Sequence, residues 1–130
     1  MAGIPLNTFR TVTSTVKYLN PYQANPTSPG TTNPNFVYTA PPGTTGIVLY
    51  MQVSNIGNAQ NFTTSAWHYR PSTTAWTNIV KNIIAPIEDA RIMLGGKLVL
   101  QTNDQLYVSG NDQDELYLQL IVSLLESANQ

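Results

Sequence analysis

The chain has 130 residues, a net charge of −1 and only 10% charged residues, and it contains no cysteine and a single histidine. Disulfides, zinc–thiolate centres and thiol nucleophiles are therefore excluded, and one histidine cannot build a multi-histidine metal site. Six dispersed basic residues cannot neutralise the row of phosphates that drives nucleic-acid binding, so we expect no nucleic-acid partner.

The N-terminal part divides into an arm, a strand and a long loop. Residues 1–9 are expected to form an arm ahead of one domain at residues 10–130. The arm lacks the basic stretch and apolar run of a signal peptide, and no apolar run approaches the ~20 residues of a membrane span. A strand is predicted over residues 10–18. Residues 19–34 contain four prolines, which cannot donate to a ladder, and this predicts a long surface loop.

The remaining chain shows period-two alternation broken by Gly, Pro, Asn and Ser clusters, which is typical of strands. The longest alternation, Thr44–Asn55, places one set of apolar residues on a common face: Ile47, Leu49, Met51 and Val53. Further strands are expected over residues 35–39, 61–70, 76–84, 97–101, 105–109 and 115–125. The last of these has an apolar face made of Leu116, Leu118, Leu120 and Val122. Its other face is amphipathic enough to meet another subunit and consists of Tyr117, Gln119, Ile121 and Ser123. Residues 35–39 are expected to turn through Ala40–Gly43 into the long strand as a hairpin, and a second hairpin joins residues 97–101 to 105–109. The helical candidate is Pro86–Leu94, with an early proline and acidic residues near its start.

About eight short strands, joined by short turns and one long connection, predict an all-β antiparallel β-sandwich. The pattern fits a jelly roll or another Greek-key topology, with at most one short helix. It does not distinguish between these topologies.

Three clusters contain residue types that could carry chemistry, and for each we favour a structural interpretation. His68 would be a base or a ligand only if carboxylates converged on it, and it is better interpreted as a hydrogen-bonded strand residue. Asp112 and Asp114 lie in a polar turn that lacks the spacing of a calcium loop, and we interpret it as a solvated turn between two strands. Whether that turn binds an ion stays open. Glu88 and Asp89 are explained by capping and a salt bridge. We therefore expect no enzyme activity, cofactor or metal.

Aromatic residues are the remaining candidates for binding. Tyr and Trp side chains bind sugars by stacking and bind protein partners through large amphipathic contact areas. We expect at least one of Trp67, Tyr69 and Trp76 to anchor an interface, while the alternative is that they fill the core and edges of the sandwich. The residues alone do not choose between a sugar and a protein partner.

The order of several turn and strand motifs resembles small virion structural proteins of tailed bacteriophages, notably of cyanophages. The motifs are Asn7-Thr8-Phe9-Arg10, Tyr38-Thr39-Ala40-Pro41-Pro42-Gly43, the aliphatic strand ending at Asn55, Gly96-Lys97-Leu98-Val99-Leu100, and the closing run 120–126. The resemblance covers most of the chain except residues 19–34. The hairpin turn has Asn103-Asp104 where those proteins have Gly-Asp. These motifs are signatures of turns and strands and carry no catalytic chemistry.

The resemblance implies a protein of the virion, assembled in the host cytoplasm, without a membrane partner. The function expected first is a capsid decoration or cement protein, a homotrimer that contacts the major capsid protein. Its partner-binding residues would be Ile4, Leu6 and Phe9 of the arm, Tyr22 of the loop, and the aromatics Trp67, Tyr69 and Trp76. A neck, baseplate or tail-fibre component is the alternative, and a carbohydrate-binding module is a further one.

Overall fold

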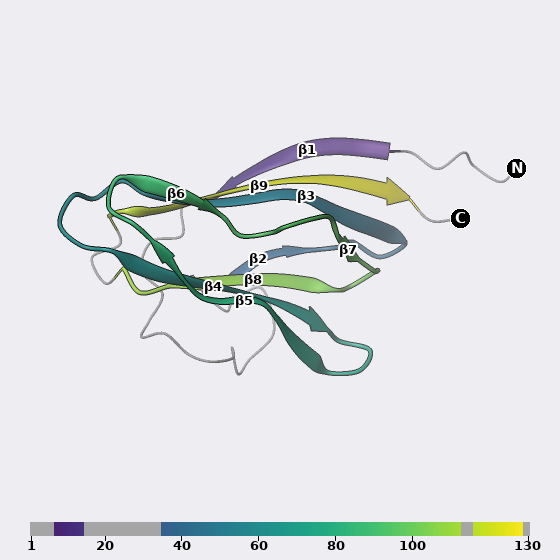
Figure 1. Ribbon diagram of the computed structural model, residues 1–130. Helices are drawn as coiled ribbons and strands as arrows, with labels where there is room; N and C mark the ends of the chain where they lie inside the picture. Colours follow the sequence, from purple (N-terminus) through teal and green to yellow (C-terminus); the bar gives the residue numbers. More distant parts are fainter. Residues whose placement is uncertain (1–6, 15–34, 113–115, 129–130) are drawn as a thin grey trace, which may run out of the picture.

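Nine β-strands in two packed layers make up the computed structural model over the residues that it describes, 7–14, 35–112 and 116–128 (Figure 1). The strands are β1 (Asn7–Ser14), β2 (Phe36–Thr39), β3 (Thr44–Asn55), β4 (Phe62–Arg70), β5 (Ala75–Ala85), β6 (Asp89–Ile92), β7 (Leu98–Leu100), β8 (Gln105–Gly110) and β9 (Leu118–Ala128). All pairings are antiparallel, and no helix occurs in those ranges. The predicted fold class, an antiparallel β-sandwich, is confirmed.

The pairing of the strands follows a nested order. The first sheet has the order β1-β9-β3-β6, with β7 also paired to β3, and the second has the order β2-β8-β4-β5. β1 pairs with β9, β2 with β8, β3 with β6 and β7, and β4 with β5. Strands from the first half of the chain therefore pair with strands from the second half, beginning with the outermost pair, β1 and β9, and ending with β4 and β5. These pairs are distributed over the two sheets. With β6 and β7 counted as one interrupted strand, this is the topology of a jelly roll.

The core lies between the sheets and is built from alternate residues of each strand. Its largest contribution comes from β9, where four alternate residues are fully buried: Leu118, Leu120, Val122 and Leu124. Leu106 and Val108 of β8 pack against them from the second sheet. This is the apolar alternation predicted for the last strand, although the strand begins at Leu118 instead of residue 115 and runs on to Ala128. Leu116, which was expected on the same face, precedes the strand and is 61% exposed.

A bulge in β3 changes the face assignment that simple alternation predicts. The strand has the predicted bounds, but its pairing with β9 shifts between Val48 and Tyr50. Val48 is therefore buried together with Met51 and Val53, while Leu49 is 37% exposed. The prediction that Ile47 and Leu49 share the face of Met51 is wrong, because the inserted residue reverses the alternation on one side of it.

The segment Pro86–Leu94 is not helical, contrary to our expectation. The Asp89 amide donates to the Pro86 carbonyl in a tight turn, and Glu88 has a φ of 54°, which interrupts any helical path. The following residues form β6, which pairs with the end of β3. Tertiary pairing has overridden a local pattern that suits a helix start.

The two predicted hairpins are turns that connect different sheets. Gly43 has a φ of 73° and follows the predicted proline pair, so the turn after β2 is confirmed, but β2 pairs with β8 while β3 lies in the other layer. The turn around Asn103, which has a φ of 71°, likewise joins β7 in the first sheet to β8 in the second. Adjacent strands cross between layers in a jelly roll, and periodicity carries no information about that.

Candidate functional site

The outward side of the first sheet is an apolar surface, which we term the outer face. Its exposed members are Leu49, Ile92, Val99 and Ile121, with exposed fractions of 37%, 62%, 53% and 39%. The strand register places Ile121, Ile92 and Val99 on this one face. Ile121 and Ile92 both pair with Gln52, and Leu125 and Val99 both pair with Ile47. Residues directly opposite one another on paired strands share a face.

The polar residues of the outer face are neutral. Tyr50 donates a hydrogen bond from its hydroxyl to Gln52 Oε1, and Gln52 Nε2 donates to Ser54 Oγ at 3.1 Å. In β6 the charged residues Asp89 and Arg91 alternate with Ala90 and Ile92, and it is Ala90 and Ile92 that pair with Ser54 and Gln52. Among the described residues of β3, β6, β7 and β9, those that share this face by register therefore carry no charge.

A second apolar surface, which we term the tip, lies where three loops meet at one end of the sandwich. It consists of Ile56, Ile87 and Leu116, which are 56%, 40% and 61% exposed. The Ile56 amide donates to the Tyr117 carbonyl at 3.0 Å, which places the loop after β3 beside the one before β9. The Glu88 amide donates to the Gly57 carbonyl at 3.1 Å, which brings in the loop after β5.

Asn55 fixes the geometry of the tip from inside. Its side chain is buried, its Nδ2 donates to the carbonyls of Gln60 and Ala85 at 3.0 Å each, and its Oδ1 accepts from the Gly57 amide at 2.9 Å. One buried amide thus ties the loop after β3 to itself and to the end of β5. Sequence reasoning missed this role, although an Asn at the end of a long strand is a common turn-forming residue.

The outward side of the second sheet is aromatic. Phe36 and Trp67 both pair with Tyr107, and Tyr69 pairs with Trp76. Tyr69 and Trp76 have ring centroids 4.4 Å apart, and Phe36 meets Tyr107 edge-on at 5.7 Å. Trp67 and Tyr107 have no exposed surface, whereas Trp76 is half-buried.

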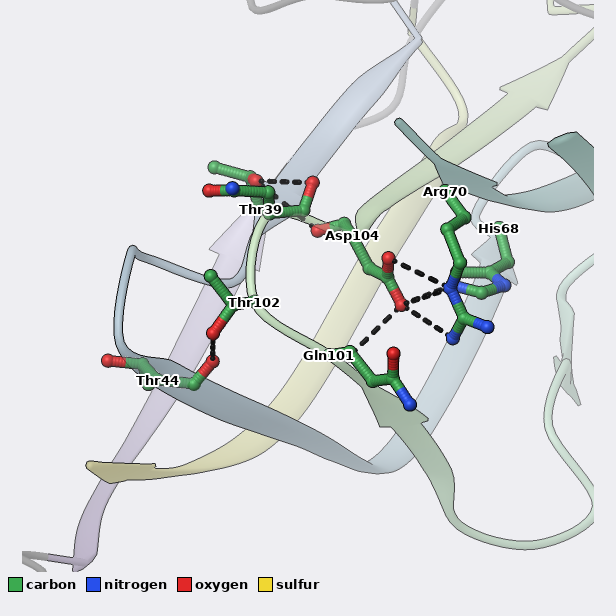
Figure 2. A network of polar contacts seen from close by, with 8 residues as sticks. Thr39, Thr44, His68, Arg70, Gln101, Thr102 and Asp104 are labelled. Carbon is green, nitrogen blue, oxygen red and sulfur yellow. Dashed lines mark hydrogen bonds and ion pairs between the residues drawn. The ribbon is translucent and has the colours of Figure 1, made fainter. Parts of the chain in front are cut away.

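A polar network closes the opposite end of the sandwich from the tip, around the turn between β7 and β8 (Figure 2). Asp104 Oδ2 accepts hydrogen bonds from His68 Nε2 at 2.9 Å, Arg70 Nη2 at 2.9 Å and the Gln101 amide at 3.0 Å. Its carbonyl accepts from the Ala40 amide at 3.0 Å. Asp104 therefore joins β4 to the turn before β8 and to the turn after β2. Its side chain is only 2% exposed, which largely shields these contacts from water.

The network shifts the pKa values of Asp104 and Arg70. Burial raises the pKa of the Asp104 carboxyl, but hydrogen bonds from Arg70, His68 and the Gln101 amide lower it more, so the pKa lies below its ordinary value. The same carboxylate raises the pKa of Arg70 through its hydrogen bonds and charge. An ionised carboxylate only accepts, so His68 Nε2 carries a proton at this contact. A carboxylate does converge on His68, but the arrangement is that of a structural ion pair.

Asp112 is buried, so our expectation that it lies in a solvated turn is wrong. Its Oδ2 atom accepts from the amides of Leu116, Tyr117 and Leu118 at 3.1, 2.7 and 3.1 Å. The carboxylate therefore binds the backbone that enters β9. Asp114, the other carboxylate considered for an ion site, lies outside the described residues.

The predicted partner-binding residues fall in different places. Ile4, Leu6 and Tyr22 lie outside the described residues, and Phe9 belongs to β1, where it pairs with Leu125 of the outer face. β1 begins at Asn7, so residues 7–9 of the expected arm are part of a strand. Trp67, Tyr69 and Trp76 come together on the aromatic side of the second sheet, where Trp67 and Tyr69 are buried. The tip was not predicted, and of the outer face the sequence indicated only the side of the last strand that carries Ile121.

Glu88 and Asp89 line an open groove of about 480 Å³ between the tip and the end of β3. Asp89 Oδ1 accepts from the Ala90 amide at 2.7 Å, and its Oδ2 accepts from Arg91 Nη1 at 3.0 Å. The backbone hydrogen bond and then Arg91 hold the pKa of Asp89 below its ordinary value. The predicted salt bridge is confirmed for Asp89, whereas the predicted capping role is wrong because the segment is not helical.

Within the ranges that the structure describes, no three His, Asp or Glu side chains gather to hold a metal ion. No helix in the described part is suited to crossing a membrane. Comparison with protein-family models, curated proteins and solved structures finds no match for the chain.

Proposed function

We propose that this protein is a non-enzymatic structural subunit of a tailed-phage virion, with capsid decoration or cement as its leading role. The observation that carries the proposal is the presence of two separate exposed apolar surfaces, the outer face and the tip, on one small domain. Clustered exposed apolar side chains on a soluble domain mark interaction sites. Two such surfaces allow one subunit to contact two neighbours, which a lattice component requires.

The rigidity of the tip supports the same proposal. Three loops that are cross-linked by backbone hydrogen bonds and by Asn55 present Ile56, Ile87 and Leu116 in a fixed arrangement. A preorganised apolar patch loses little side-chain and loop entropy when it binds. The tip is thus the surface suited to the shell, that is, to the major capsid protein, while the outer face is free for another contact.

The jelly-roll fold and the motif resemblance to virion proteins add to this proposal by analogy only, because many functions share the fold. The aromatic side of the second sheet lends less support to the carbohydrate-binding alternative. Its central rings, Trp67 and Tyr107, present no surface on which a sugar could stack.

The decisive experiment adds purified protein to particles of the encoding phage that lack it and measures bound copies and heat tolerance of the shell. We expect copy numbers comparable to that of the major capsid protein, and a shell that survives higher temperature. The double variant Ile56→Lys/Leu116→Lys should lose binding, whereas Ile84→Lys, a 53% exposed residue of β5, should retain it. About a dozen copies per particle would instead indicate the neck or baseplate. Complete absence from particles would refute the virion role.

A further inference from the structure

We propose that the outer face of the first sheet is the surface through which two copies of this chain associate, face to face, about a two-fold axis. This inference rests on the proposed function, because it names the partner for one of the two surfaces. It assigns a dimer as the building unit, where the motif resemblance implies a trimer.

The chemistry of the outer face favours a second copy over an unlike partner. In a two-fold interface each surface meets itself, so any net charge would repel its own copy. In the described parts of β3, β6, β7 and β9, the outer face carries no charged side chain. It consists of aliphatic side chains beside the neutral residues Tyr50, Gln52 and Ser54. An apolar centre that lacks charge is the composition found at the cores of homodimer interfaces.

The dimensions of the outer face are sufficient for a stable dimer. Four strands at a spacing of about 4.8 Å give a width of roughly 19 Å, and the eight residues from Ile47 to Ser54 at about 3.3 Å each give a length of roughly 26 Å. A face of this size covers roughly 500 Å² on each copy, or about 1,000 Å² in total, which reaches the minimum area expected of a specific interface.

The exposed residues are positioned where such an interface needs them. Ile121 lies on β9, which stands between β1 and β3, and Ile92 and Val99 lie on the two short strands that border β3 on its other side. The three apolar side chains therefore span the sheet from its middle to one edge. The charged pair Asp89 and Arg91 belongs to the same edge strand but alternates with Ala90 and Ile92, so it lies on the other side of the sheet and leaves the outer face without charge.

The inference is tested with the full chain by sedimentation equilibrium at low and high salt. We expect a dimer whose dissociation constant changes less than about threefold between the two salt concentrations, because no charge pairs are buried. Ile121→Lys should weaken association by at least about tenfold, since it would bury two like charges. Ile84→Lys on β5 is the matched control and should dimerise as wild type does. Circular dichroism and thermal midpoints establish that each variant is folded.

A crosslinking measurement gives an independent readout that does not depend on a destabilising charge. The chain has no cysteine, so Gln52→Cys introduces a single thiol at the centre of the outer face. A short bismaleimide should join two Gln52→Cys chains and leave two Thr77→Cys chains, modified on β5, unjoined.

A wild-type trimer, a monomer at high concentration, or equal dissociation of the Ile121→Lys and Ile84→Lys variants would overturn the dimer. A monomeric chain that still enters particles would overturn the dimer and leave the proposed function in place. A dimeric chain that never enters particles would overturn the proposed function and leave the dimer in place.

Discussion

His68 Nε2 lies 2.9 Å from Asp104 Oδ2, although His68 is in the middle of the sequence on β4 and Asp104 is in the turn between β7 and β8. The contact is one of a set that includes Arg70 and the Gln101 amide. The only histidine of the chain is thus engaged with a carboxylate that holds the two sheets together at one end.

Removal of the Asp104 carboxylate should destabilise the fold. Asp104→Ala is expected to lower the free energy of unfolding by about 2–4 kcal/mol, because two cationic or donor side chains and one amide lose a nearly buried acceptor. Thermal denaturation followed by circular dichroism should show a midpoint lower by roughly 10 °C. Asp89→Ala removes an exposed carboxylate and should leave the midpoint unchanged. Equal effects of the two substitutions would contradict the role of Asp104.

The same carboxylate should make stability depend on pH in the acid range. The pKa of Asp104 is lower in the folded chain than in the unfolded chain, so its contribution is present above the unfolded value of about 4 and is lost as pH falls through the lower folded value. Urea denaturation at a series of pH values should show that Asp104→Asn flattens the decrease below about pH 4. A variant curve parallel to that of the wild type would exclude Asp104 as the source.

Asp112 should be the second carboxylate on which the fold depends. Asp112→Ala frees three backbone amides at the entrance to β9 and is expected to cost about 3 kcal/mol. Asp112→Asn keeps an acceptor oxygen and should cost less. The order of stability measured by urea denaturation should be wild type, Asn variant, Ala variant. An Ala variant as stable as the wild type would show that these amides find other acceptors.

Asn55 links the stability of the tip to its binding. Asn55→Ala removes three hydrogen bonds inside the tip, which should lower the free energy of unfolding by about 2–3 kcal/mol and weaken binding to particles. Asn58→Ala changes an exposed residue of the same loop and serves as the control. Hydrogen exchange of the Gly57 amide reports directly on the lost contact. Unchanged protection of that amide in Asn55→Ala would refute the assignment.

The two tryptophans should differ in solvent access. Trp76→Phe leaves the fully buried Trp67, whose fluorescence should be blue-shifted and resistant to iodide, while Trp67→Phe leaves the half-buried Trp76, which iodide should quench. Glycan binding that is lost in Trp76→Ala would support the carbohydrate-binding alternative. Quenching of Trp67 to the level of Trp76 would contradict its burial.

Local pattern predicted the elements of this fold better than their partners. The bounds of β3 match the predicted strand, and the turn at Gly43 matches the predicted turn, because both depend on neighbouring residues. The bulge at Leu49, the strand at Asp89–Ile92 and the crossing between β7 and β8 depend on which segment pairs with which. Such pairings join residues far apart in the sequence, and alternation alone does not specify them.

For the candidate surfaces, too, the sequence predicted features within one strand but not the contacts between distant segments. Ile121 was expected on the free side of the last strand, and it is exposed there. Its neighbours Ile92 and Val99 come from β6 and β7, which reach it only through β3. The exposure of Ile56, Ile87 and Leu116 at one place required knowledge of three loops at once. A single sequence shows which residues are apolar but not which of them gather outside the core.

The nested strand order has a consequence for synthesis of the chain. β9 lies between β1 and β3, so the first sheet has no centre until β9, the last of the described strands, has left the ribosome. The hairpin of β4 and β5 can form early, because its strands are neighbours in the sequence, whereas β1 waits for the most distant partner in the molecule. Nascent chains of this protein are therefore expected to keep β1 unpaired until a late closing step.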